Sequence, residues 1–287
     1  MPVLAETRRV TVRYGALTAV DSVDLTVRSR EVVGLLGANG AGKTTLIRLL
    51  LGLLRPSSGE ALLFSTVPSV SARRRVGYVP QTLGLYADMT VEENWTFTLA
   101  AFGARLVSVP SSISDLKDQL VGTLPLGAQR RVAFAVAFSH APELLVLDEP
   151  TSGVGPLGRA RLWQDIRQSA EHGAGVLVTT HNMEEAEQCD RLVVLVDGRV
   201  GADGTVGDLI ADREVAEVRS ADWQRAFEIL DVEGFVIQMH GDVLRVPSTR
   251  RQVEDLLERR GVRATVTTVP ANLEEAFVMM VSARSHG

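Results

Sequence analysis

The sequence is poor in cysteine, and this excludes a disulfide framework. Cys189 is the single cysteine among 287 residues, so no internal disulfide can form, and we expect a reducing compartment. Cys189 lies in the stretch EEAEQCDRLVVLV, where we interpret it as a small packing residue and not as a nucleophile.

The sequence also lacks segments that would direct it into or across a membrane. Its first residues, MPVLAETRR, contain no apolar region of the kind that signal peptides carry. No stretch approaches the roughly 18 uninterrupted apolar residues of a spanning helix. We therefore expect a cytosolic protein, and any role at a membrane would depend on a partner.

An excess of basic residues is missing too. The formal net charge is −5 and the sequence pI is about 5.6. This balance argues against nucleic-acid binding through overall electrostatics, although a local basic patch stays open. No nucleic-acid partner is therefore expected. The sequence shows neither low-complexity segments nor internal repeats.

What the sequence does contain is enough apolar material for one large and one small domain. Hydrophobic residues make up 45% of the chain, an ordinary share for a globular protein. Within residues 1–210, residues 8–12 and 22–27 alternate like strands of an antiparallel sheet, and the later strands alternate with helices as in a series of βαβ units. Strands are predicted at 8–12, 22–27, 32–36, 76–79, 144–147, 176–180 and 192–196, and helices from 46, irregularly over 90–119, and over 125–140, 157–172 and 183–190.

The remaining residues, 211–287, predict a small α+β accessory domain. The expected order is strand, helix, two strands joined at HGD, helix (249–260), strand (264–269) and a last helix from Ala271. This order resembles a ferredoxin-like unit with an appended helix. Leu273, Phe277 and Met280 recur at helical spacing in the last helix, and we interpret them as core residues.

The stretch VVGLLGANGAGKTTLIRLL (32–50) predicts a phosphate-binding loop. An apolar strand ends at Gly37, and the glycines that follow let backbone N–H groups approach an anion closely. The start of the next helix adds the positive end of its dipole. Lys43 adds a charge for the β- and γ-phosphates, and Thr44 adds a hydroxyl for Mg²⁺. We expect a nucleoside triphosphate to be bound by the whole loop, Gly37, Ala38, Asn39, Gly40, Ala41, Gly42, Lys43, Thr44 and Thr45.

A second buried strand, in LLVLDEP, ends in two carboxylates. Asp148 follows the strand at its carboxyl end, where open α/β sheets place ligands. There it could hold the hydration shell of Mg²⁺, while Glu149 could direct the water that attacks the γ-phosphate. The alternative is a strand that ends in a solvated acidic turn.

With these motifs, the chain resembles the ATP-binding subunit of an ABC transporter over residues 14–204. The resemblance implies an α/β fold, with a P-loop NTPase ABC ATPase domain built from an antiparallel β subdomain, a RecA-like core and a helical subdomain. Tyr14 would stack on adenine. Gln81 would contact Mg²⁺ and relay the nucleotide state to a membrane subunit, and His181 would contact the γ-phosphate. The alternatives are a packed turn tyrosine, a polar strand-end residue and a structural histidine.

Two motifs depart from the pattern of that family. The stretch LPLGA (124–128) stands at the place of the LSGGQ signature, whose helix offers its N-terminal amides to the nucleotide of the opposite subunit. Pro125 suits a first helical turn, but a serine hydroxyl and one glycine are missing. We interpret the signature as altered and still functional, with Leu124 and Gly127 as nucleotide contacts. Gly155, in TSGVGPLG, replaces an aspartate that helps to couple the two sites of the dimer.

The resemblance implies a site whose catalytic residues are Glu149, His181 and Lys43, whose Mg²⁺ residues are Thr44, Gln81 and Asp148, and whose cofactors are ATP and Mg²⁺. The partners would be an integral-membrane permease and a second ATP-binding subunit, either an identical copy or a partner with a consensus signature. The location would be the cytoplasmic face of the cell membrane. Residues 94–124 are shorter than the usual helical arm that docks on the permease.

The function implied is that of an ATP-hydrolysing motor subunit, and LPLG, GLYADMTVEEN, DEPTSGV and LEEAFVMMV are similar to stretches of ABC-2 type exporters, drug and antibiotic resistance systems included. One alternative is a soluble ABC ATPase acting on ribosomes or DNA. It is disfavoured because neither a second nucleotide domain nor a long coiled-coil insertion is visible in the sequence. Another is a regulatory module that closes on ATP and scarcely hydrolyses it, which Gly155 and Pro125 would favour.

Overall fold

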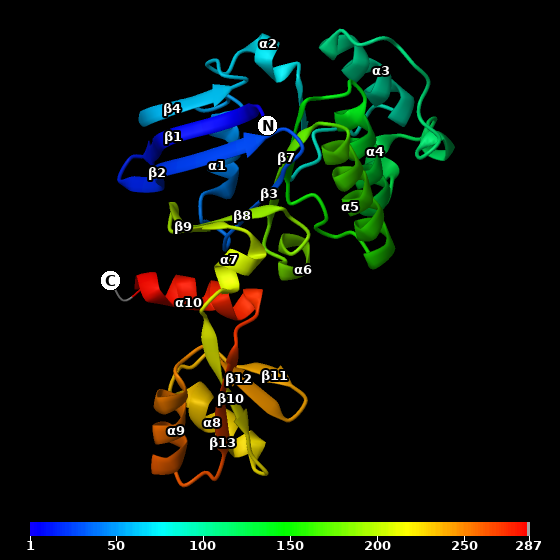
Figure 1. Cartoon of the computed structure of the whole chain (residues 1–287). Helices are drawn as coiled ribbons and strands as arrows, with labels where there is room; N and C mark the ends of the chain where they lie inside the picture. Colours follow the sequence, from blue (N-terminus) through cyan, green and yellow to red (C-terminus); the bar gives the residue numbers. More distant parts are fainter. Residues whose placement is uncertain (286–287) are drawn as a thin grey trace. The chain divides into compact units, whose positions relative to one another are not determined.

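A long antiparallel hairpin opens the fold. The computed structural model, which describes residues 1–285, pairs β1 (Val3–Tyr14) with β2 (Leu17–Arg28) and with β4 (Ser58–Leu63) in the order β2-β1-β4 (Figure 1). Gly15 takes a left-handed φ of 60° at the hairpin turn, which glycine adopts without strain. The predicted strands at 8–12 and 22–27 are confirmed as parts of longer strands.

A sheet of six strands forms the centre of the first unit. Its order is β5-β6-β7-β3-β8-β9, and the pairs from β5 to β8 are all parallel; the strands are β5 (Val76–Val79), β6 (Leu144–Asp148), β7 (Gly175–Thr180), β3 (Val32–Leu36), β8 (Arg191–Val196) and β9 (Arg199–Gly204). The inner strands β3, β6 and β7 are buried throughout, as expected for a parallel sheet covered on both faces, and are apolar except at the carboxyl ends of β6 and β7. The carboxyl ends of these parallel strands therefore lie along one edge.

Gly34 breaks the apolar run of β3 for a packing reason. A Cβ atom at this position would lie 2.7 Å from the Sγ of Cys189 and 2.6 Å from a methyl carbon of Leu192. Cys189 is itself buried, and burial raises the pKa of its thiol to about 12. Cys189 is thus an inert packing residue, as the sequence predicted.

The five predicted helices of the first unit are present in the predicted order, two of them differ in extent, and the short α2 (Val70–Arg73) was not predicted. Together the helices are α1 (Lys43–Leu50), α2, α3 (Val91–Phe102), α4 (Leu126–Phe138), α5 (Pro156–Glu171) and α6 (Met183–Ala186), and α3 and α5 both pack against α4. The irregular helix predicted over 90–119 is regular only as α3, which ends at the left-handed Gly103. Two short 3₁₀ turns follow, Ser114–Leu116 and Val121–Thr123.

The predicted helix 183–190 is also shorter in the structure. It ends at Ala186 because the chain turns back toward β3. The N–H of Asp190 donates to the carbonyl of Val32, and its carboxylate accepts from the N–H of Val32 at 2.7 Å.

The second unit follows the predicted order of elements. Four antiparallel strands in the order β11-β12-β10-β13 give the ferredoxin-like arrangement. Its elements are β10 (Glu214–Arg219), α8 (Trp223–Val232), β11 (Gln238–His240), β12 (Val243–Val246), α9 (Arg250–Arg259), β13 (Thr265–Pro270) and the appended α10 (Leu273–Ser285). In α10, Leu273 and Met280 are buried and Phe277 is half-buried.

The contacts of the chain divide it after Val200 into two compact units, 1–200 and 201–287, whereas the sequence placed the boundary near residue 210. The residues between the two boundaries, 201–210, comprise most of β9 and α7 (Val206–Ile210), and α7 packs against α10 within the second unit. Among residues 1–285, no helix is long and apolar enough to cross a membrane.

Candidate nucleotide site

The predicted site residues gather at one edge of the parallel sheet. Gln81 follows β5, Asp148 and Glu149 end β6, His181 follows β7, and the loop 37–45 follows β3. These four strands are neighbours in the sheet although they are far apart in the sequence. The topology therefore explains why separate motifs can form one site.

The loop between β3 and α1 has the backbone geometry of an anion cradle. Gly40 and Gly42 take left-handed φ values of 84° and 100°. A Cβ at Gly42 would lie 2.5 Å from the carbonyl oxygen of Ala19, so only glycine fits there. A Cβ at Gly37 would lie 2.7 Å from the carbonyl oxygen of Leu195.

Lys43 begins α1 and is almost entirely buried. Its Nζ donates to the carbonyl oxygens of Gly37, at 2.7 Å, and Ala38, at 3.1 Å. Burial lowers the pKa of the ammonium, while the carboxylates of Glu149 and Asp148 oppose this shift. The cation is therefore held inside the loop by two carbonyl groups, and in the described part of the chain no carboxylate forms an ion pair with it, so it is in a position to bind an anion.

Asp148 connects the loop to two strands. Its Oδ2 accepts from the hydroxyl of Thr44 at 3.0 Å, and its Oδ1 accepts from the hydroxyl of Thr179 at 2.7 Å. The same Thr179 hydroxyl accepts from the backbone N–H of Glu149 at 2.8 Å. Thr179 thus fixes both members of the acidic pair, a role that the sequence did not assign, although a polar residue near the end of an apolar strand was visible.

Glu149 has a strained backbone and a loosely held carboxylate. Its φ is 50°, in the left-handed region that costs a non-glycine residue about 1–2 kcal/mol. The amide nitrogen of Gln81 and the Nδ1 of His181 each lie 3.5 Å from one of its carboxylate oxygens. The structure therefore brings Gln81, Glu149 and His181 together, and their contacts with Mg²⁺, water and the γ-phosphate stay predictions.

Two further polar groups behind the acidic pair were not predicted. Arg130, on α4, donates from Nη1 to the carbonyl oxygens of Glu149 and Pro150. Glu185 is buried and accepts hydrogen bonds from the hydroxyls of Thr151 and Thr180. The sequence could not separate Arg130 from its neighbour Arg131, because both occur in the same run of the helix.

Three predicted residues are not joined to this cluster. Tyr14 lies at the end of β1 with 48% of its surface exposed. Leu124 is buried under α4, and Gly127 lies in the first turn of α4, where an added Cβ would meet open space. Within residues 1–285, no hydrogen bond or ion pair connects these three with the loop 37–45. Their contacts with nucleotide stay predictions.

Comparison with known proteins identifies the family. The model of the ABC transporter family matches residues 20–152. The Nod factor export ATP-binding protein I of Burkholderia orbicola is 37% identical over 295 residues, with 95% of each chain covered. The chain belongs to the ABC transporter ATP-binding proteins. As an ABC protein it carries the ATPase domain of that family, and the fold class predicted from sequence is confirmed.

Other relatives agree with this assignment. The probable multidrug ABC transporter ATP-binding protein YbhF of Escherichia coli is 38% identical over 77% of this chain, but the match spans 40% of that relative's length. Among solved structures, an ATP-binding subunit of an ABC transporter has a TM-score of 0.65 at 29% identity, covering 72% of this chain and 91% of its own. A dimeric bacterial ABC transporter cassette, 23% identical, has the same TM-score and supports the fold.

Two side-chain oxygens beside the loop 37–45 are suited to bind Mg²⁺ together with a nucleotide. Thr44 and Asp148 place two oxygens within 3.0 Å of each other beside the loop, and Mg²⁺ prefers oxygen ligands together with water and phosphate. Residues 1–285 contain no cluster of three or more His, Cys, Asp or Glu side chains that could hold a metal alone. A site with so few protein ligands suits Mg²⁺ that is bound together with the nucleotide phosphates.

Proposed function

We propose that this chain is the ATP-hydrolysing motor subunit of an exporter of the ABC-2 type, acting at the cytoplasmic face of the cell membrane with a separate permease. The observation that carries the proposal is the meeting of Lys43, the Thr44–Asp148 pair and Glu149 at one edge of the sheet. An anion cradle beside an acidic pair is the arrangement that phosphoryl transfer requires.

In this proposal each side chain has a separate role. The amides of the loop 37–45 and Lys43 bind the phosphates. Thr44, Gln81 and Asp148 would hold Mg²⁺, which would supply positive charge to offset that of the phosphates. Glu149 accepts a proton from the attacking water. Its carboxylate makes only 3.5 Å contacts with Gln81 and His181, so it is free to reorient toward that water. His181 then contacts the γ-phosphate.

We propose that two ATP-binding subunits enclose the nucleotides between them. Each site would use the α4 N-terminus of the opposite subunit, with Leu124 and Gly127 near the phosphates. Leu126 occupies a signature position, is 48% exposed, and contacts the loop that contains Gly153. Because this signature is altered, two identical copies should hydrolyse ATP slowly, and pairing with a consensus subunit should raise the rate. Fast cooperative turnover by the purified chain alone would contradict this.

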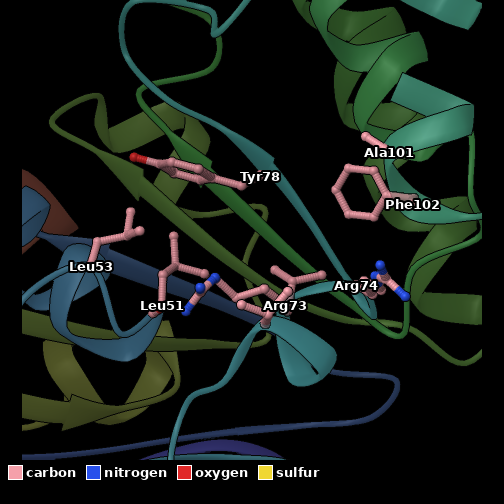
Figure 2. A pocket seen from close by; sticks show the side chains of 9 residues that line it. Leu51, Leu53, Arg73, Arg74, Tyr78, Ala101 and Phe102 are labelled. Atoms are coloured by element: carbon pink, nitrogen blue, oxygen red, sulfur yellow. Dashed lines mark hydrogen bonds between the residues drawn. The ribbon is translucent and has the colours of Figure 1, made fainter. Parts of the chain in front are cut away.

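A groove beside β5 is the place where we propose that the permease docks. Figure 2 shows Leu51, Leu53 and Tyr78 on one side of it and Ala101 and Phe102 on the other. Its volume is about 360 Å³, and Leu53 is 58% exposed. Tyr78 lies on β5, whose carboxyl end leads to Gln81. Movement of a helix in the groove could therefore reach Glu149 through Gln81.

The docking proposal can be tested by cross-linking in membranes. Native Cys189 is buried and unreactive, so a cysteine introduced by Leu53→Cys would be the reactive thiol. We expect it to cross-link to a multi-spanning protein, whereas Val232→Cys, on an exposed residue of the second unit, should not. Equal labelling of both variants would contradict the proposed groove.

Export as the direction of transport rests on the relatives. Their names include multidrug transport and Nod factor export, and the LPLG and LEEAFVMMV stretches support the same subgroup. The decisive experiment is co-purification of the tagged chain with a permease, followed by ATPase measurement of the complex and of its Lys43→Ala variant. Nucleotide affinity and turnover that survive Lys43→Ala would refute the motor assignment.

A regulatory module that binds ATP and scarcely hydrolyses it is the second candidate. Gly155 favours it, since it has no side chain with which to couple two sites, and an added Cβ there would meet open space. The variant Gly155→Asp distinguishes the two functions. A motor with weak coupling should gain cooperativity from the new carboxylate, whereas a regulatory module should stay equally slow.

A further inference from the structure

Arg130 is a buried cation that, within the described residues 1–285, forms no ion pair with a carboxylate. It lies in the second turn of α4 with 4% of its surface exposed. Its Nη1 donates to the carbonyl oxygens of Glu149, at 3.0 Å, and Pro150, at 2.9 Å. Its buried Nε has no hydrogen-bond partner, and within residues 1–285 no ion pair includes Arg130.

Such a group is costly for the fold. A buried guanidinium loses its hydration, and neutral carbonyl groups compensate it only in part. Burial accordingly lowers the pKa of Arg130, with the charge of Glu149 acting in the opposite direction. An apolar side chain of similar length would fill the same space at lower cost. The contribution of the arginine must therefore come from its hydrogen bonds to the carbonyl oxygens of Glu149 and Pro150.

Both ends of the strained Glu149 residue are fixed by side chains. On one side its N–H donates to Thr179, and on the other its carbonyl accepts from Arg130. Between them Glu149 adopts its left-handed φ of 50°, which persists only where the surroundings enforce it. This conformation directs the carboxylate toward Gln81 and His181.

We propose that Arg130 is a positioning residue, which holds the backbone of Glu149 in the conformation needed for hydrolysis and ties it to helix α4. The inference rests on the proposed function. Helix α4 begins at Leu126, in the altered signature that would contact the nucleotide of the other subunit. A displacement of α4 on closure would move Arg130 and with it the carbonyl of Glu149. Nucleotide binding at the site shared with the other subunit could thus change the position of Glu149. This coupling would not need the aspartate that Gly155 replaces.

The test compares two adjacent arginines of α4. Arg130→Met removes the donors and keeps a long unbranched side chain. Arg131→Met is the matched control, because Arg131 is exposed and reaches the carbonyl of Ser112 and, at 3.6 Å, Asp115, away from Glu149. We expect Arg130→Met to lower kcat about tenfold to hundredfold, as for the loss of a charged donor to buried carbonyls, with the Kd for ATP within about threefold. Arg131→Met should retain the unsubstituted kcat.

A double-mutant cycle separates positioning from general support of the fold. In a Glu149→Gln background, single-turnover rates with enzyme in excess should show no further loss on adding Arg130→Met, since no base remains to be positioned. Arg130→Lys, which keeps a donor, should recover part of kcat. Additive losses, or a fall in ATP affinity equal to the fall in kcat, would overturn the proposal.

The remaining outcomes are also informative. If Arg130→Met fails to fold, the same cycle with Arg130→Gln decides, since its short neutral side chain removes the charged donors, and a kcat equal to that of Arg131→Met there contradicts positioning. If the unsubstituted complex hydrolyses no ATP, the proposed function itself fails. If it hydrolyses ATP and Arg130→Met equals Arg131→Met, only the present inference fails.

Discussion

A buried arginine of the first unit and a partly buried arginine of the second unit are compensated in opposite ways. Arg245, on β12, forms a bidentate pair with Glu275 at 2.6 and 2.8 Å, and the Glu275 side chain is completely buried. Arg130 donates to the carbonyl groups of Glu149 and Pro150. The charge of Arg245 is thus compensated within the second unit by Glu275. In the first unit, Arg130 has carbonyl groups in place of a carboxylate, and it lies where nucleotide chemistry is proposed.

Glu275 also caps a helix, which shows how completely it is used for structure. Its carboxylate accepts from the N–H of Asn272 at 2.7 Å, and the side chain of Asn272 accepts from the N–H of Glu275 at 2.8 Å. This reciprocal pair fixes the start of α10. Glu149, in contrast, keeps its carboxylate in 3.5 Å contacts. Substitutions of the two acids should therefore affect different properties.

The largest expected effect is on turnover, from Glu149→Gln. Loss of a general base costs about 10²- to 10⁴-fold in rate. We expect kcat of the permease complex to fall by this factor, while equilibrium binding of ATP and the urea midpoint of unfolding change little. A turnover within about threefold of the unsubstituted protein would show that Glu149 is as structural as Glu275.

The converse substitution, Glu275→Gln, should act on stability. It leaves the partly exposed Arg245 with Glu217, at 3.8 Å, as its counter-charge. The expected loss is therefore below the roughly 3–5 kcal/mol that breaking one side of a fully buried pair typically costs. Urea unfolding should show this loss, and turnover per folded molecule should stay unchanged. Glu274→Gln, on an exposed neighbour in the same helical turn, is the control and should change the unfolding free energy by less than about 0.5 kcal/mol.

A smaller effect is expected from Thr179→Val, which keeps the shape of the side chain and removes its hydroxyl. Asp148 then loses a donor and the N–H of Glu149 loses its acceptor, at about 1–3 kcal/mol for a buried group left unpaired. We expect both stability and turnover to fall. Thr268→Val, on an exposed residue of β13, should alter neither. If Thr179→Val lowered the unfolding free energy and left turnover per folded molecule unchanged, Thr179 would have no role in the nucleotide site.

The same contrast explains what sequence could and could not predict. Glycine spacing and the strand-end acids predicted the loop 37–45, Asp148 and Glu149, because local backbone needs and apolar runs leave a direct pattern. The ferredoxin-like order was predictable from alternation alone. Arg130 and Glu275 were not, because an arginine and a glutamate on amphipathic helices look the same whether they face solvent or a buried partner. Only the packing of α4 and β12 distinguishes them.

The dependence of the unfolding free energy on pH below neutrality tests the structural role of Glu275 further. Burial alone would raise the pKa of Glu275, but hydrogen bonds from Arg245 and from the N–H of Asn272 outweigh it, so its pKa lies below the ordinary value. A lowered pKa of Glu275 in the folded state stabilises the protein at pH values above its unfolded-state pKa of about 4.3. This contribution is lost as the pH falls through the unfolded-state pKa and then through the folded-state pKa.

The unfolding free energy of the unsubstituted chain minus that of Glu275→Gln should therefore be constant from neutral pH to about pH 5 and shrink below it. Urea titrations across this range measure the difference directly. If it stayed constant far into acid, the carboxylate of Glu275 would not be the group that stabilises Arg245, and the contrast with Arg130 would lose its basis.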